Sequence, residues 1–508
     1  MNPKISRRLF LGGAASFGAF SGCRFVSVPN GSFAYGKPNL KFGVVSDIHI
    51  HRIGAGEKRE DWQNNLTFKH TLEWFRDQGA DAVMVAGDMA DYGMVDQLQA
   101  VAEAWYAVFP NDRAPDGRKV EKLFVHGNHD YHGYLYGDFA AKLYPDEIER
   151  RKHVLRADMG GWWKKIFHED YSRFYVKDIK GYRFLGAHWD DGTGMEAKYG
   201  KNTYGVELAA YLDAKGRTLD PAHPFFYFQH PHPRDTCYGP WAWGHDSGLV
   251  TKTLSAYSNA VAFSGHSHYS LTDERSLWQG AFTSVGTSSL RYTGMPYNAR
   301  HPVGYENTTT EAKGREAIDA LKATPRFSPG DCRQGMMWNV YDDCIVVQRR
   351  EFLSDSFLGP DWVMPLPAAE PKPFDFASRA KMVKAPQFAK DAKLVVEKVT
   401  AKTRATAGHP AVQKEAYRIT IPAALAAPGA RPHEYEVAAE GKSGKAATFY
   451  VMAEGFNHAL THPRATAPTT CTLTTDRLPE NVACFKVRPL DCWWNKGAAL
   501  VEAAASCK

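Results

Sequence analysis

The chain has 508 residues, which exceeds one ordinary domain and is enough for two or three. A composition that is 44% hydrophobic and 23% charged is typical of a soluble globular protein. The formal net charge of +6 is spread over this length without a long Lys/Arg run, so no nucleic-acid-binding patch is evident.

Residues 1–35 have the layout of an export signal and are not expected to join the fold. A basic start with Arg7 and Arg8 precedes a short apolar run, too short to serve as a membrane-spanning anchor. The stretch "SRRLFL" resembles the twin-arginine export signal of bacteria. "FSGC" resembles a lipobox, which makes Cys23 a candidate for a lipid anchor; cleavage after Ala34 is the alternative. The prediction is export across the bacterial inner membrane, to the periplasm or as a membrane-anchored lipoprotein.

Apolar runs and amphipathic helices alternate between residues 38 and 356. This alternation predicts an α/β domain with a largely parallel or mixed sheet. The expected strands are 40–47, 81–88, 122–130, 182–188, 224–230 and 259–268, with helices at 64–79 and 94–109. Later strands are expected at 282–289 and in a hairpin over 336–352.

The remaining chain differs from this pattern. Residues 357–389 are rich in proline and are predicted to be a linker. Residues 390–508 contain short alternating runs separated by turn residues, which predicts a small all-β sandwich of the fibronectin or immunoglobulin kind. No CxxC spacing is present, so a structural zinc cluster is not expected.

Each of five apolar runs in the first domain ends in residues that bind metals. These residues are Asp47 and His49, Asp88, Asn128 and His129, His230 and His232, and His266 and His268. In an open α/β sheet, ligands bind outside the carboxyl ends of the strands, so these side chains are expected to converge. Carboxylate, imidazole and amide ligands suit divalent transition metals, and there are more ligands than one ion requires. The pattern therefore favours two metal ions.

In this order, the motifs "DIH", "GD", "GNHD", "H" and "GHSH" resemble the calcineurin-like metallophosphoesterase family. The likeness runs from Asp47 to His268, about half of the chain. It implies a four-layer α/β/β/α sandwich, with two divalent ions (Mn, Fe, Zn or Co) and a bridging hydroxide that attacks a phosphate ester. The substrate would be a small-molecule or polymer phosphate ester.

The resemblance leaves the kind of ester open. Phosphodiesters are slightly favoured, because His49 and "GNHD" occur across the diesterases of the family. A phosphomonoesterase acting on a nucleotide, sugar or lipid phosphate is one alternative. The other is a non-catalytic surface binding protein on the same scaffold.

The resemblance also assigns roles by position. The first metal would be held by Asp47, His49 and His268, the second by Asn128, His230 and His266, and both by Asp88. His129 would protonate or stabilise the leaving oxygen, and Asp130 would orient His129. Of the two histidines after the strand 224–230, His230 is favoured over His232 because it ends the strand directly. Purple acid phosphatases have "GDxxY", whereas this chain has Asp91 at the Tyr position, so a tyrosinate–ferric site is not expected.

Two segments between the motifs are expected to set the substrate specificity, residues 131–173 and 231–248. Tyr131, Trp162 and Trp163 from the first segment, and His232 from the second, are candidate substrate contacts. The alternative for the aromatic residues is that they pack the core of a subdomain.

Overall fold

The computed structural model describes residues 26–28, 32–34, 36–50, 63–189, 205–240, 242–293, 305–307, 332–368, 372–402, 412–425 and 431–504. Arg7, Arg8 and Cys23 of the predicted export signal lie outside these residues; within the signal, only the paired strands β1 (Val26–Val28) and β2 (Ser32–Ala34) are described. Among the described helices, none combines the length and the apolar character that a membrane crossing requires. The cysteines in the described part of the chain form no disulfide with one another.

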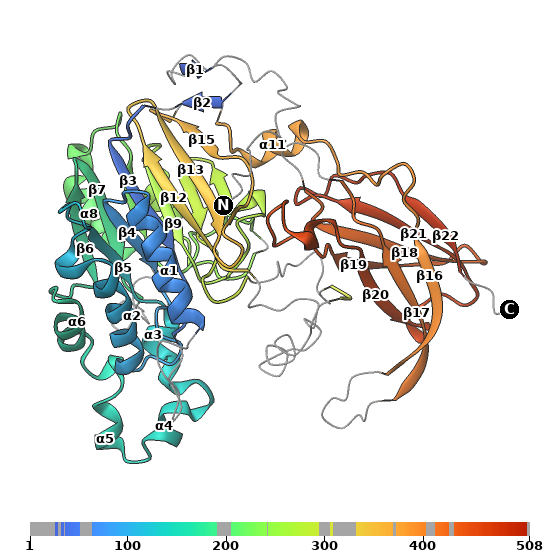
Figure 1. The fold of residues 1–508 in the computed structure, drawn as a ribbon, viewed down its shortest axis with the longest axis horizontal. Coiled ribbons are helices and arrows are strands. Elements are labelled where there is room, and N and C mark those ends of the chain that lie inside the picture. The colour runs from blue at the N-terminus through green and yellow to red at the C-terminus, as the bar shows by residue number, and fades with distance from the viewer. Residues whose placement is uncertain are drawn as a thin grey trace, which may run out of the picture.

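Two sheets, formed by strands between Leu40 and Pro365, lie face to face in the N-terminal half of the molecule (Figure 1). The seven-stranded sheet contains β3 (Leu40–Val45), β4 (Ala82–Ala86), β5 (Glu121–Val125), β12 (Gln334–Val340), β13 (Cys344–Glu351), β14 (Ser356–Phe357) and β15 (Trp362–Pro365). The six-stranded sheet contains β6 (Phe174–Ile179), β7 (Tyr182–Ala187), β8 (Phe225–Phe228), β9 (Ala260–Ser264), β10 (Leu277–Gln279) and β11 (Thr283–Gly286). Neighbouring strands run parallel in both sheets, β3–β4–β5 in the seven-stranded sheet and β7–β8–β9–β11 in the six-stranded sheet.

Strand alternation divides the apolar side chains between two faces of each sheet. Phe42 of β3 faces the core between the sheets, where its ring packs against Phe226 and Phe263 of the other sheet. The neighbouring Gly43 faces outward, and a Cβ there would lie 2.4 Å from the ring of Phe75. A side chain at position 43 would therefore push the covering helix off the sheet.

Helices cover both outer faces. The seven-stranded sheet packs against α1 (Gln63–Asp77), α2 (Val95–Val108) and α6 (Met159–Phe167). The six-stranded sheet packs against α8 (Val206–Lys215) and α9 (Leu249–Leu254). Short helices α3 (Asn128–His132), α4 (Phe139–Leu143) and α5 (Glu147–Arg151) lie between β5 and α6. This arrangement confirms the predicted four-layer α/β/β/α sandwich.

The C-terminal part is all-β, as predicted. One antiparallel sheet has the order β16 (Val395–Lys402), β17 (Gln413–Ile421), β20 (Thr469–Thr474). The other has the order β19 (Ala446–Met452), β18 (Glu434–Gly441), β21 (Val482–Leu490), β22 (Leu500–Ala503). Their facing side chains form a separate apolar core that includes Ile419, Val437 and Phe485.

The segment 357–389, predicted as a linker, contains regular structure. Its strand β15 pairs antiparallel with β13, so the seven-stranded sheet continues beyond residue 356. The short helix α11 (Phe376–Met382) follows and lies between the two halves of the molecule (Figure 1). Proline obscured the strand because Pro365 is tolerated at the end of a strand on the edge of a sheet.

Candidate metal centre

The loops that follow parallel strands bring the predicted ligands to one edge of the sandwich. The strands β3, β4, β5, β8 and β9 are followed by Asp47 and His49, Asp88, Asn128, His230, and His266 and His268. Backbone hydrogen bonds connect the loops of each sheet: Asp47 N donates to Gly87 O at 3.0 Å, and Gly265 N donates to His230 O at 2.9 Å. Between the two sheets, His266 N donates to Asp47 Oδ2 at 3.1 Å. Residues from both sheets therefore meet at one place.

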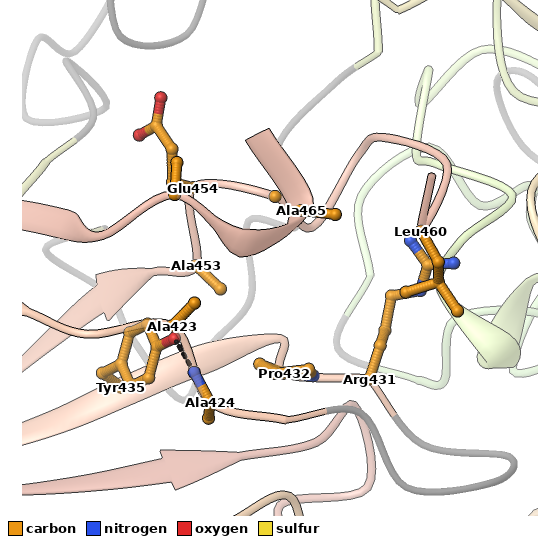
Figure 2. A pocket seen from close by; sticks show the side chains of 11 residues that line it. Ala423, Ala424, Arg431, Pro432, Tyr435, Ala453, Glu454, Leu460 and Ala465 are labelled. Carbon is orange, nitrogen blue, oxygen red and sulfur yellow. Dashed lines mark hydrogen bonds between the residues drawn. The ribbon is translucent and has the colours of Figure 1, made fainter. Parts of the chain in front are cut away.

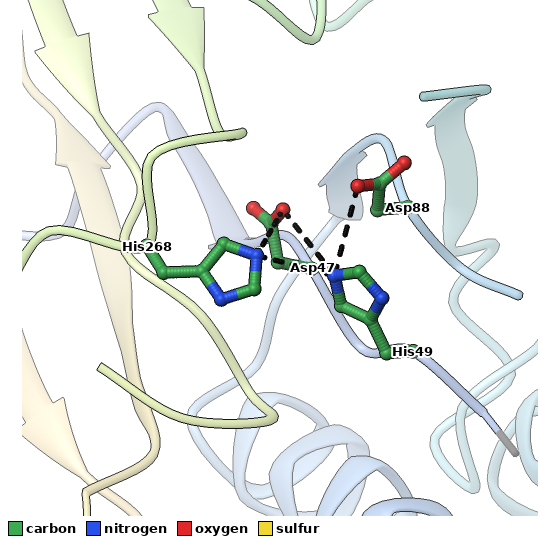
Figure 3. Close-up of side chains that lie close together, drawn as sticks. All are labelled: Asp47, His49, Asp88 and His268. Carbon is green, nitrogen blue, oxygen red and sulfur yellow. Dashed lines mark hydrogen bonds and ion pairs between the residues drawn. The ribbon is translucent and has the colours of Figure 1, made fainter. Parts of the chain in front are cut away.

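The first ligand group consists of Asp47, His49, Asp88 and His268, and Figure 3 shows these four side chains pointing toward one another. One ligand atom from each lies within 4.8 Å of the others, and all four residues are buried. His268 Nε2 is 3.0 Å from Asp47 Oδ1, and His49 Nε2 is 3.6 Å from Asp88 Oδ2. Carboxylates gathered away from water are costly unless a cation compensates them.

The second ligand group consists of Asp88, His230 and His266. His230 Nε2 lies 3.0 Å from Asp88 Oδ2, so Asp88 is shared by both groups. Asn128 donates from Nδ2 to the hydroxyl of Tyr136 at 3.0 Å. Its Oδ1 is buried and has no hydrogen-bond partner among the described residues. An unsatisfied buried amide oxygen costs about 1–3 kcal/mol, which a bound cation would offset.

Hydrogen bonds on the far side of two imidazoles fix which nitrogen is available. His230 donates from Nδ1 to Ala86 O at 2.8 Å, which leaves Nε2 as the ligand atom. His49 Nδ1 lies 2.9 Å from Asp91 Oδ1, which likewise leaves Nε2 toward the centre. Metal-binding histidines are oriented in the same way.

The backbone of the site is strained. Five of the seven predicted ligands have a left-handed conformation, namely Asp47 (φ 52°), His49 (48°), Asp88 (53°), His266 (73°) and His268 (57°). Residues with a Cβ rarely adopt it, and such residues gather where function requires a particular geometry. Gly127 permits the close approach of two loops, because a Cβ there would lie 2.1 Å from Asp88 Oδ1.

The charges of the site suit cations. Burial would raise the pKa of Asp47, but His268 and His230 hold that pKa well below its usual range. Burial opposes a charge on His230, yet in the absence of ions Asp88 and Asp47 raise its pKa to about 9. Burial lowers the pKa of His266 to about 3, so this imidazole is neutral at neutral pH. Anionic carboxylates, oriented imidazoles and an orphaned amide oxygen fit two divalent cations.

His129 lies beside these groups but is oriented by a different residue than predicted. Its Nδ1 is 2.8 Å from Asp91 O and 3.5 Å from Asp91 Oδ1. The carboxylate of Asp130 instead accepts from the backbone N–H groups of Gly127, Met89 and Ala90 at 2.8, 3.2 and 2.7 Å. Asp130 therefore ties the loop after β4 to the loop after β5, and the prediction that it orients His129 is corrected.

His232, predicted to contact substrate, lies behind the centre. It is 1% exposed, and its two ring nitrogens are each 2.7 Å from a hydroxyl oxygen, that of Ser264 and that of Ser267. Both nitrogens are thus engaged inside the protein. The prediction that His232 contacts substrate is therefore corrected. Of the two histidines that follow β8, His230 is the one that reaches the ligand groups.

The three predicted aromatic contacts have other neighbours. Trp163 belongs to α6, is 4% exposed, and packs against Phe167 in the core between α6 and the sheet. The core-packing alternative therefore holds for Trp163. Trp162 is half-buried against the same core. The guanidinium of Arg156 lies over the ring of Tyr131, with Arg156 Cζ 4.6 Å from the centroid of the ring.

Other residues surround the ligands that no motif had indicated. The rings of Tyr136, Trp243 and Tyr292 lie 4.8, 4.5 and 4.5 Å from those of His129, His266 and His268. Tyr136 and Trp243 fall within the segments 131–173 and 231–248, so their location in the chain was indicated although the residues were not. Arg291 pairs with Asp91 and had no sequence signal.

A separate pocket lies in the C-terminal sandwich (Figure 2). Its wall includes Tyr435, Glu454 and Arg431. The guanidinium of Arg431 donates to the carbonyls of Phe456, His458 and Leu358 at 3.1, 2.6 and 2.6 Å. The charge of this pocket is therefore used to hold the fold together.

Comparisons with known proteins bear on the same region. Residues 40–270, which include all seven predicted ligands, match the family model for calcineurin-like phosphoesterases. A comparison with curated proteins gives no match. Solved structures similar to the chain include a dimetal phosphatase from Danio rerio, with 13% identity, 64% of this chain and 99% of that chain covered, and a TM-score of 0.35. A purple acid phosphatase from yellow lupin has 12% identity, with 65% of this chain and 55% of that chain covered and a TM-score of 0.37. An archaeal phosphodiesterase has 11% identity, with 64% of this chain and 100% of that chain covered and a TM-score of 0.22.

Proposed function

We propose, from the match of residues 40–270 to the family model for calcineurin-like phosphoesterases, that the protein is a metal-dependent hydrolase of phosphate esters. The observation that carries this proposal is the pair of ligand groups that share Asp88. A shared carboxylate between two sets of ligands is the arrangement that places two cations close together.

The residues of the chain divide into two sets of metal ligands. Asp47, His49 and His268 would hold one ion, and Asn128, His230 and His266 the other, with Asp88 contacting both. When bound, such a pair of ions activates water and neutralises charge on a phosphate group. His266 and Asn128 are less buried than the first ligand group, so the substrate is expected to enter from their side.

His129 has the position and charge of a proton donor. Burial opposes its protonation, but without ions the carboxylates of Asp88 and Asp91 raise its pKa to about 9. Its side chain is 28% exposed, compared with 0–7% for Asp47, His49, Asp88, His230 and His268, so it can reach a bound substrate. With Nδ1 engaged by Asp91, Nε2 remains to protonate the departing oxygen.

Phosphodiesters are the proposed substrates, and phosphomonoesters are the alternative. The diester preference is supported by the sequence resemblance, since His49 and the "GNHD" segment occur across the diesterases of that family. The metal ligands serve either reaction, so the choice between them falls to the residues around the centre.

The test is turnover by the mature protein after removal of metals and reloading with Mn²⁺. Release of p-nitrophenol from bis(p-nitrophenyl) phosphate is compared with release from p-nitrophenyl phosphate. Asp88→Asn is the matched variant, because it can keep the acceptor for His129 N (2.8 Å from Asp88 Oδ1) while losing the charge shared by both groups. Faster release from the diester, lost in the variant, is the expected result.

Two other results would change the proposal. Faster release from the monoester would make the protein a phosphomonoesterase. No release from any ester by protein that holds two metal ions per chain would instead favour a binding protein on this scaffold.

We also infer that the protein acts after export from a bacterial cytoplasm. The support is the twin-arginine-like "SRRLFL" segment and the lipobox-like "FSGC". Fractionation of cells that express Arg7→Lys/Arg8→Lys protein should show retention in the cytoplasm. Mass spectrometry of wild-type and Cys23→Ser protein would distinguish a lipid on Cys23 from cleavage after Ala34.

A further inference from the structure

The loop that follows β8 holds an exposed tryptophan over a candidate metal ligand. Trp243 is 52% exposed and is the one tryptophan among the large exposed apolar side chains of the described residues. Its ring is stacked on that of His266, with centroids 4.5 Å apart and planes at 25°. An exposed indole beside a polar site is the usual starting point for a binding surface.

The exposure of Trp243 is built into a fixed loop. His232 N donates to Gly244 O, and Asp246 N donates to His232 O, both at 2.8 Å. Gly244 has φ +91°, and a Cβ there would lie 3.1 Å from His266 Cδ2. A residue with a side chain would therefore not fit well between the loop and the imidazole of His266. The indole is thus held in place before any substrate arrives, which reduces the entropy cost of binding.

The surroundings of Trp243 and of His266, on which it stacks, offer aromatic surface more than hydrogen bonds. The ring of Trp189, which is half-buried, lies 5.7 Å from that of His266. The polar side chain of Asp246 accepts from Gln229, Arg234 N and Gly248 N inside the loop. His245 Nε2 is 3.4 Å from Cys237 O. A sugar needs several polar partners, whereas a flat ring needs only a face on which to stack.

We propose that Trp243 is a stacking surface for a planar aromatic group carried by the phosphate ester, and that it selects esters with such a group. The proposal rests on the proposed function, because the phosphate is taken to bind at the metal ligands next to His266. A ring one or two bonds away from that phosphate would then reach the indole.

The test uses phosphonates, which bind like phosphate esters but have no ester bond to hydrolyse. Dissociation constants of methylphosphonate, benzylphosphonate and cyclohexylmethylphosphonate are measured by calorimetry on the full Mn²⁺-loaded protein. Wild-type protein should bind benzylphosphonate about 5- to 150-fold more tightly than methylphosphonate, the range expected for one stacked ring. Trp243→Ala should abolish most of this ratio, and Trp243→Phe should keep most of it.

Three results would overturn the proposal. These are an unchanged ratio in Trp243→Ala, no preference for benzylphosphonate in the wild type, and equal affinity for the cyclohexyl compound, which would indicate apolar contact without stacking. Turnover is measured separately, so a protein that shows the stacking preference but hydrolyses no ester would contradict only the proposed hydrolase activity.

Discussion

The carboxylate of Asp91 contacts both a candidate metal ligand and the candidate proton donor. Its Oδ1 lies 2.9 Å from His49 Nδ1 and 3.5 Å from His129 Nδ1, and it pairs with Arg291. Asp91 is 3% exposed, so these contacts form away from water and are strong. At the residue scale, Asp91 orients two imidazoles that have different tasks.

Replacing Asp91 by Asn should therefore weaken metal binding and shift the pH dependence. Loss of a residue that orients a metal-binding histidine costs about 10- to 100-fold in metal affinity or activity. The carboxylate raises the pKa of His129, so its removal lowers that pKa. The alkaline limb of the pH profile, where His129 loses its proton, should therefore shift to lower pH. Metal titration by calorimetry and the pH profile of kcat measure both effects.

The control is Asp355→Asn, which alters an Asp–His pair at the surface. In that pair Asp355 Oδ1 lies 2.8 Å from His70 Nε2. It should leave both quantities unchanged. Unaltered metal affinity together with an unaltered pH profile in Asp91→Asn would refute the role given to Asp91.

Asn128 offers the second prediction at this scale. Asn128→Leu removes the orphaned Oδ1 but keeps a side chain of similar size, so the metal content should fall from two ions per chain toward one. Tyr136→Phe is the matched control, since it removes only the partner of Asn128 Nδ2 and should keep both ions. Elemental analysis of the dialysed proteins measures this. Two ions in Asn128→Leu would remove Asn128 from the ligand set.

At the element scale, one carboxylate ties together parts of both sheets and α11. Glu274, just before β10, accepts from Arg349 Nη1 of β13 at 2.9 Å and from Trp362 Nε1 of β15 at 3.1 Å. It also pairs with Arg379 of α11. This helix is therefore attached to the α/β/β/α sandwich by a largely buried ion cluster.

The pKa of Glu274 makes this attachment sensitive to acid. Burial would raise the pKa, but Arg349 and Arg379 lower it to about 2, below the value of 4.5 for an unperturbed Glu. A lowered carboxyl pKa stabilises the fold above the unfolded value, and this contribution is lost as the pH falls from about 4.5 toward 2.

Glu274→Gln should lower the free energy of unfolding at pH 7 by about 3–5 kcal/mol, because it leaves two buried guanidinium groups without their carboxylate. The difference from wild type should shrink as the pH falls through that window. Urea unfolding at several pH values measures it. A difference that stays constant with pH would mean that the charge of Glu274 does not contribute.

At the scale of the whole molecule, the two halves share side chains. Tyr305 lies in the apolar core of the C-terminal sandwich, and its hydroxyl donates to Glu434 at 2.7 Å. The next residues, Glu306 and Asn307, contact Arg477 and the backbone of Met452. In the opposite direction, Ala459 of the C-terminal half packs in the core between the six-stranded and seven-stranded sheets.

Because of this exchange, a change in one half should destabilise both. Tyr305→Phe removes a buried hydrogen bond to a carboxylate, which costs about 1–3 kcal/mol. Thermal unfolding is monitored by two signals, the loss of phosphoesterase activity and the change in circular dichroism. Both signals should show the same lowered midpoint temperature. Tyr257→Phe, whose hydroxyl lies 3.5 Å from Leu212 O, is the control and should have a smaller effect. Separate midpoints for the two signals would show that the halves unfold independently.

Local pattern determined a large part of this architecture. Apolar runs ending in Asp, His or Asn predicted both the strands and the residues that follow them, because parallel strands place their carboxyl ends at one edge. Alternating runs likewise predicted the all-β C-terminal part. The strand β15 escaped prediction because its proline-rich sequence is typical of a linker, and only pairing with β13 makes it a strand.

The sequence by itself determined which side chains could bind metals, since that depends on residue type and on position after a strand. Only the tertiary structure decided what holds each of those side chains. Asp130 binds backbone N–H groups while Asp91 faces His129, and His232 is enclosed by two serines. Trp243 stacks on His266 although Trp163, equally aromatic, is buried in the core. Hydrogen-bond and ring partners come from loops far apart in the chain, and their meeting depends on how the two sheets pack.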